Sequence, residues 1–139
     1  MKAITVRQPW AWGIAWAGKP IENRSWFTNY RGELAIHAAS TFSRREYEWA
    51  RTFMLGLGIE TPAAGALDTG RVVAVTRLVD VRKTTSDLAQ WETAGGYAFI
   101  LENTKPIQPF ACRGQQGLWS IPDDLLHLLG RTLSQPPSR

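Results

Sequence analysis

The sequence has few of the residues that bind metals or form disulfides. Among its 139 residues it contains one cysteine, Cys112, and two histidines, His37 and His127. One cysteine cannot form an internal disulfide, and this set falls short of the four ligands of a structural zinc site. Cys112 also has no nearby histidine or aspartate in the sequence to support a nucleophile. We therefore expect no metal, no cofactor and no cysteine-based catalysis.

Long apolar runs are missing as well. No stretch approaches the roughly 18–20 uncharged apolar residues that span a bilayer. Arg7 follows the opening Met1-Lys2-Ala3-Ile4, where a signal peptide would have an apolar segment. A content of 44% hydrophobic and 20% charged residues is typical of soluble globular proteins. These features predict a cytoplasmic protein with no membrane partner.

The chain shows no internal repeat and no domain boundary. We predict a single domain over residues 1–130, followed by a disordered tail over residues 131–139 that contains Ser134-Gln135-Pro136-Pro137. A chain of this length buries enough surface to fold without disulfides.

Apolar spacing predicts a mixture of strands and helices. Strands are expected over residues 3–6, 34–38, 71–81, 97–101, 107–111 and 118–121, with an extended segment at 21–27 pairing with 34–38. Three helical segments are expected: residues 9–18, the segment that follows the capping box Ser43-Arg44-Arg45-Glu46, and residues 123–129. The first is apolar nearly all round and should be buried. The predicted core contains Ile4, Val6, Ile14, Leu34, Ile36, Val73, Val75, Phe99, Ile100 and Trp119. Short strands with irregular connections favour an α+β domain built on a small mixed β-barrel.

Positive charge is concentrated at the start of the chain. Residues 1–32 contain five basic residues and one acidic residue, whereas residues 33–139 contain 11 of each, so the whole net charge of +4 lies in the first quarter. The same quarter holds four of the seven tryptophans. Bases interleaved with aromatic rings are typical of surfaces that bind nucleic acids, although most of these tryptophans are expected in the core.

The densest polar cluster is Gly18-Lys19-Pro20-Ile21-Glu22-Asn23-Arg24. An extended backbone places Glu22 and Arg24 on one face, where they can pair. Lys19 is a candidate anion ligand, or a general base if burial lowers its pKa. The alternative is an exposed lysine that caps the preceding helix, beside a surface ion pair.

A second cluster, Arg7-Gln8-Pro9-Trp10, joins the first strand to the first helix. Arg7 and Gln8 present planar hydrogen-bonding groups beside the free amides of a helix start, which suits contact with a phosphate or a base edge. Arg7 is equally suited to holding the turn through backbone carbonyls. We interpret His37, late in a strand, as a core histidine and not as a catalyst.

Five segments together resemble the ASCH domain family, a branch of the PUA-like superfamily. They are residues 7–11, 18–24, 30–32, 36–38 and 114–119, and the resemblance covers about residues 3–121 in order. It implies a barrel of about five or six strands with flanking helices, and a cleft that binds RNA. The residues then expected to contact nucleic acid are Arg7, Gln8, Lys19, Glu22, Asn23, Arg24, Tyr30 and Arg31.

The partner expected first is single-stranded RNA or a nucleotide, with single-stranded DNA less favoured. Two alternatives stay open. Some ASCH proteins are amidohydrolases that act on acylated cytidine, with a threonine three residues after the lysine and a glutamate in the central strand. Here Lys19 matches, but Glu22 replaces the threonine and the strand position falls near Ala74. A hydrolase or ribonuclease would therefore use Lys19 and Glu22 as catalytic residues, while a protein adaptor would bind an acidic peptide with the same basic face.

Overall fold

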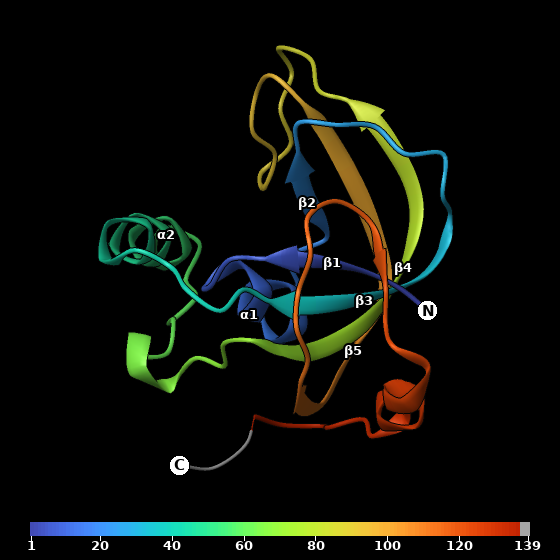
Figure 1. Cartoon of the computed structure of the whole chain (residues 1–139). Helices are drawn as coiled ribbons and strands as arrows, with labels where there is room; N and C mark the ends of the chain where they lie inside the picture. The colour runs from blue at the N-terminus through green and yellow to red at the C-terminus, as the bar shows by residue number, and fades with distance from the viewer. Residues whose placement is uncertain (137–139) are drawn as a thin grey trace.

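Six strands form one mixed sheet in the computed structural model, which describes residues 1–136 (Figure 1). The strands are β1 (Lys2–Val6), β2 (Ile21–Arg24), β3 (Gly32–Ala38), β4 (Arg71–Lys83), β5 (Tyr97–Ala111) and β6 (Trp119–Ser120). The helices are α1 (Trp10–Trp16), α2 (Arg44–Gly56) and two 3₁₀-helices, η1 (Ala64–Ala66) and η2 (Asp123–Gly130). The strand order is β2-β5-β4-β3-β1-β6, with β1 and β3 parallel and all other neighbours antiparallel.

The predicted α+β class is confirmed, but a closed barrel is not. β2 forms one edge of the sheet and β6 the other, and no strand pairing among residues 1–136 joins these edges. The long strands β4 and β5 curve together (Figure 1). At the end of β2, the Arg24 guanidinium donates a hydrogen bond to the Thr5 carbonyl of β1. The Arg24 side chain thus connects β2 with β1, two strands that are not paired with each other in the sheet.

Two predictions about strand pairing are wrong. The segment at 21–27 does not pair with 34–38, because β3 already lies between β1 and β4 and β2 pairs with β5. The strands expected at 97–101 and 107–111 are one strand, β5. Asn103 has a φ of 54° and the β4–β5 register shifts nearby. Asparagine tolerates this left-handed conformation, so the strand bends there and continues.

Apolar side chains cover both faces of the sheet. Alternation along β1 and β3 places Ile4 and Ile36 in a core with α1, whereas Ala3 and Ala35 belong to a second core near η2. Eight of the ten predicted core residues are buried; the exceptions, half-buried, are Val75 and Ile100.

Helix α1 is only partly buried, contrary to the prediction of a wholly buried helix. Ala11, Gly13, Ile14 and Ala15 are buried. The three tryptophans of the helix, Trp10, Trp12 and Trp16, are only half-buried, because smaller residues occupy the face that packs against the sheet.

The chain stays against β5 after η2. The Gln108 amide donates to the Arg131 carbonyl at 2.5 Å, and the Leu133 amide donates to the Pro106 carbonyl at 2.8 Å. Part of the predicted tail, residues 137–139, lies outside the described residues. Within residues 1–136, no helix has the length and apolar character needed to cross a membrane.

Candidate functional site

A cleft of about 1200 Å³ lies where β1, β2 and β3 meet the start of α1 and the segment after β5. Three arginines line it, Arg7, Arg24 and Arg113, and we call it the arginine cleft. Two further predicted site residues, Glu22 and Asn23, also line it. The fold therefore gathers residues from both polar clusters of the sequence in one place.

Lys19, Glu22 and Arg24 form a buried ionic network beside this cleft. Lys19 Nζ donates to the Ile21 carbonyl at 2.5 Å and to Glu22 Oε1 at 3.4 Å. Arg24 Nε lies 3.0 Å from Glu22 Oε2, so the predicted Glu22–Arg24 pair is present. Only 4% of Lys19 and 7% of Glu22 is exposed. The alternative of an exposed capping lysine is therefore wrong.

Burial changes the acid–base properties of Lys19. Removal from water lowers the pKa of its ammonium, the charge and hydrogen bond of Glu22 raise it, and the nearby Arg24 lowers it further, so that the pKa lies below its ordinary value. A lysine in this state can act either as a fixed cation or as a proton acceptor.

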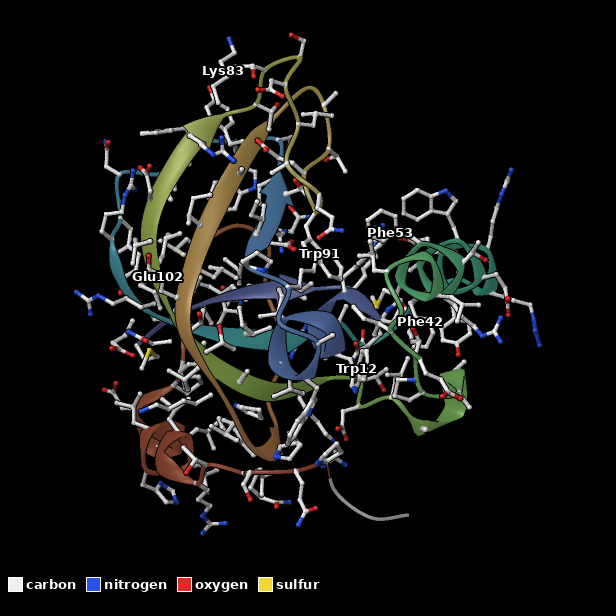
Figure 2. The ribbon with its side chains drawn as sticks, turned by 180° about the vertical axis from the view of Figure 1, so that it is seen from behind. Trp12, Phe42, Phe53, Lys83, Trp91 and Glu102 are labelled. Atoms are coloured by element: carbon white, nitrogen blue, oxygen red, sulfur yellow. The ribbon has the colours of Figure 1, made fainter. Side chains whose placement is uncertain are left out.

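Lys19 does not line the arginine cleft but a second, smaller cavity of about 720 Å³. Its walls carry four aromatic side chains, Trp10, Trp49, Phe53 and Trp91, and we call it the aromatic pocket. Phe53 comes from α2 and Trp91 from the loop between β4 and β5, and the two residues lie close together (Figure 2) with their rings edge-on. Of these four residues only Trp10 belongs to a segment that the sequence marks as a candidate site, because Trp49 and Phe53 lie in a helix and Trp91 in a loop with no such local signal.

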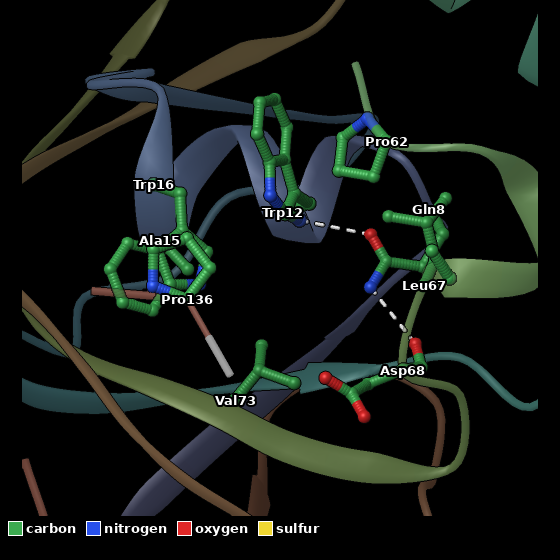
Figure 3. Close-up of a pocket in the computed structure, with 10 residues that line it drawn as sticks. Gln8, Trp12, Ala15, Trp16, Pro62, Leu67, Asp68, Val73 and Pro136 are labelled. Atoms are coloured by element: carbon green, nitrogen blue, oxygen red, sulfur yellow. Dashed lines mark hydrogen bonds between the residues drawn. The ribbon is translucent and has the colours of Figure 1, made fainter. Parts of the chain in front are cut away.

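Arg7 and Gln8 have different surroundings. Arg7 is exposed and its guanidinium lies 3.2 Å from Glu46 Oε2 on α2. Gln8 is buried: its Nε2 donates to the Asp68 carbonyl and its Oε1 accepts from the Trp12 amide, each at 2.9 Å (Figure 3). It lines a separate cavity of about 450 Å³. Gln8 therefore ties the β1–α1 turn to the loop before β4 and does not face the arginine cleft.

Three other residues predicted to contact nucleic acid, Asn23, Tyr30 and Arg31, instead form hydrogen bonds with backbone groups of the protein. Asn23 Nδ2 donates to the Trp91 carbonyl at 2.9 Å and Oδ1 accepts from the Thr93 amide at 3.0 Å, which holds the β4–β5 loop. The Tyr30 hydroxyl donates to the Glu33 carbonyl. Arg31 donates to two backbone carbonyls at 2.8 Å each. Tyr30 and Arg31 line neither the arginine cleft nor the aromatic pocket.

The positive charge of the first 32 residues is largely paired in the fold. Arg7 pairs with Glu46, Arg31 lies 3.7 Å from Asp80, and Lys19 and Arg24 share Glu22. Glu46 and Asp80 come from distant elements, so the sequence could not show this pairing. Within residues 1–136, Arg113 in the arginine cleft makes no ion pair. An exposed pair such as Arg7–Glu46 is worth about 1 kcal/mol or less, so an incoming anion can replace the carboxylate at small cost.

His37 lies in the arginine cleft with both ring nitrogens occupied. Nε2 is 2.6 Å from the Cys112 carbonyl and Nδ1 is 3.2 Å from Thr5 Oγ1. A carbonyl oxygen only accepts, so Nε2–H donates to the Cys112 carbonyl, and in the neutral ring Nδ1 is left to accept from the Thr5 hydroxyl. Burial lowers the pKa of the ring, and the Cys112 carbonyl only partly opposes this. The interpretation of His37 as a hydrogen-bonded core histidine is confirmed.

Comparison with known proteins places this arrangement in a family. The family model of the ASCH domain matches residues 4–115, most of the chain. The chain belongs to the ASCH domain family. It is also 28% identical over 133 residues to the human protein "Activating signal cointegrator 1", a match that covers 89% of this chain and 22% of that protein. The chain thus spans about a fifth of the length of this curated relative.

The acid that the resemblance places in the central strand is absent from this ASCH domain. Ala74 is buried in the core within β4. A different carboxylate, Glu92 of the β4–β5 loop, lines the aromatic pocket together with Lys19. Its Oε1 accepts from Arg82 and from the Ala89 amide, at 3.0 and 2.9 Å. Nothing in the local sequence around Glu92 marks it as a site residue, because its place in the pocket depends on the fold of the loop.

No group of three or more His, Cys, Asp or Glu side chains in the described part of the ASCH domain is arranged to hold a metal ion. Burial also raises the pKa of the Cys112 thiol, with a smaller contribution from the charge of Asp124. The polar chemistry of the site therefore rests on Lys19, Glu22 and the arginines.

Proposed function

We propose that this ASCH domain binds single-stranded RNA or a nucleotide in the arginine cleft, with single-stranded DNA as a weaker ligand. The observation that carries the proposal is the clustering of Arg7, Arg24 and Arg113 around one cleft of about 1200 Å³. Arginine suits phosphate recognition because its planar group donates several hydrogen bonds at once. Membership of a family whose wider superfamily mostly binds RNA supports the same ligand class.

The three arginines are not equivalent. Arg113 makes no ion pair within residues 1–136, and Arg7 is held only by an exposed pair with Glu46. Arg24 binds Glu22 and the Thr5 carbonyl, so its main role is to hold the site together. We therefore assign phosphate contact chiefly to Arg7 and Arg113, and orientation of Arg24 and Lys19 to Glu22.

The test is a titration of a labelled 12-nucleotide uridine RNA at low and at moderate salt. Each phosphate contact with a single strand contributes a slope of about −0.7 in log K against log salt, so two or three contacts predict about a 7–20-fold loss of affinity for a fourfold rise in salt. Arg113→Ala should weaken binding and flatten this slope. Arg131→Ala is the charge-matched control, because Arg131 is exposed and lies outside the arginine cleft.

Binding that is absent or independent of salt would contradict the proposal. An acidic peptide that binds where the RNA does not would support the protein-adaptor alternative instead. The RNA is recovered after each titration and its length is checked, because a ribonuclease would shorten it.

A second candidate, an amidohydrolase acting on acylated nucleosides, is favoured by one observation. Lys19 is buried, has a lowered pKa and lies 3.4 Å from Glu22 at the wall of the aromatic pocket. Such a pair can exchange a proton with a bound amide and water. Lys19→Arg separates the two functions, because arginine keeps the positive charge but does not lose its proton.

We expect a panel of acylated cytidines to remain intact with the parent protein, and Lys19→Arg to retain RNA binding. Hydrolysis by the parent that is lost in Lys19→Arg, with the variant still folded by circular dichroism, would replace the binding proposal with the enzyme.

A further inference from the structure

Four aromatic rings from three segments meet in the aromatic pocket. Trp49 and Phe53 lie one turn apart on α2 and stack nearly parallel, at 5.8 Å and 5°. Trp10 of α1 meets both rings edge-on, at 5.8 and 5.9 Å. Trp91 meets Phe53 edge-on at 5.6 Å. These contacts hold the rings in fixed orientations.

This cluster is not a closed core. Trp49 leaves 61% of its surface exposed, the largest fraction among the large hydrophobic residues of 1–136. Exposed aromatic surface of this kind, next to a cavity, is typical of a binding site. The volume of about 720 Å³ lies within the range of pockets that hold small organic groups.

The charges around the pocket favour a ligand with two parts, a flat uncharged ring and an attached anionic group. The three carboxylates that line it are each in an ion pair: Glu22, Glu46 and Glu92. Arg45, which is exposed and makes no ion pair within the described residues, adds a positive charge to the wall. A nucleotide has this combination of a planar base and a phosphate.

The aromatic pocket adjoins the arginine cleft. Trp10, Glu22, Asn23 and Glu46 line both cavities. A single strand with its phosphates in the cleft can therefore turn one base into the pocket. A base-paired duplex cannot, because its bases face each other.

We propose that the aromatic pocket is a stacking site for one unpaired nucleobase, with Trp49 as its exposed face. The site rests on the proposed binding of nucleic acid in the arginine cleft and adds selectivity for single strands. Trp49 and Phe53 supply the stacking surface, and Trp91 closes the pocket from the β4–β5 loop. Because any base can stack on an aromatic ring, the site distinguishes single strands from duplexes but does not select a base sequence.

The experiment measures binding of the full chain to three labelled probes: the 12-nucleotide uridine RNA, an abasic strand of equal length, and a 12-base-pair RNA duplex. We expect the uridine strand to bind most tightly. Trp49→Ala should weaken its binding about 5–150-fold, as expected for the loss of one stacked base, and leave binding of the abasic strand unchanged. Trp49→Phe should retain most of the affinity.

Phe27→Ala is the matched control, since Phe27 is 48% exposed, packs edge-on against Tyr97 and lines neither cavity. The proposal is overturned if Trp49→Ala binds uridine RNA as the parent does, or if the parent binds abasic and uridine strands equally. In both cases salt-dependent binding that requires Arg113 would leave the proposed function intact. If the parent binds none of the probes, both proposals fail.

Discussion

His37 shows how one buried side chain links the fold to pH. Its two ring nitrogens contact the Cys112 carbonyl and the Thr5 hydroxyl. Burial holds the pKa of the folded state below the ordinary value of 6.5. As the pH falls below 6.5, His37 takes up a proton in the unfolded chain before it does so in the folded protein. The free energy of unfolding therefore decreases from pH 6.5 down to the folded-state pKa and changes no further below it.

This predicts a pH-dependent difference between the parent and His37→Gln. Glutamine can donate to the Cys112 carbonyl and accept from Thr5, but it does not titrate. Urea unfolding between about pH 7.5 and pH 5 should show the parent losing more stability than the variant. The carboxylates titrate in both proteins, so the difference isolates His37. Parallel stability curves would show that His37 is not held neutral.

Strand alternation was enough to predict that Glu22 pairs with Arg24, because both lie on one face of an extended segment. The burial of Lys19 was beyond prediction, because it depends on how α1 packs: the lysine side chain lies beside Gly13 and near the Trp10 ring of that helix. For the same reason Gln8, expected as a ligand contact, is instead a buried link between two loops. Local pattern shows which side chains share a face but not what covers them.

At the scale of elements, the segment after β5 packs directly over β1 and β3. Gly114 leaves no room for a side chain: an added Cβ would lie 2.6 Å from His37 Cε1 and 2.8 Å from Thr5 Oγ1. The reason for glycine here is space, since its φ is not in the left-handed region. This close approach forms one wall of the arginine cleft.

Gly114→Ala should therefore push the segment away from His37 and destabilise the fold by about 1–3 kcal/mol, the usual cost of overpacking. Gly65→Ala is the control, because nothing lies within 4 Å of its added Cβ, and it should change stability by about 0.5 kcal/mol or less. Urea midpoints give both values. Equal midpoints for Gly114→Ala and the parent would show that the segment is not packed as described.

Elements with a strong local signal were predicted well. The N-cap predicted at Ser43 is present, because the Glu46 amide donates to Ser43 Oγ at 3.0 Å, and α2 begins at Arg44. Elements whose bounds depend on long-range strand pairing were predicted less well. The single strand β5 looked like two strands because Asn103, Pro106 and Pro109 interrupt its apolar pattern, whereas pairing with β4 carries it through.

At the scale of the whole molecule, one sheet separates two cores. The core beside α1 includes Ile14, Leu78 and Phe99, and the core beside η2 includes Ile107 and Trp119. Strands β1, β3 and β4 contribute to both, since alternate residues face opposite sides. A disturbance in one core therefore reaches the other through shared backbone, which supports the proposal that residues 1–130 form one domain.

Ile107→Ala tests this proposal. Ile107 is 1% exposed in the core beside η2, and its truncation should cost about 2–5 kcal/mol. If residues 1–130 unfold as one unit, tryptophan fluorescence and far-ultraviolet circular dichroism should shift to the same lower urea midpoint, because Trp10, Trp16 and Trp26 pack against the other core. Leu126→Ala, at a residue of η2 that is 37% exposed, should leave both midpoints nearly unchanged. Two separate transitions in Ile107→Ala, one at the parent midpoint and one lowered, would show that the two cores fold independently, since Trp119 reports on the core beside η2.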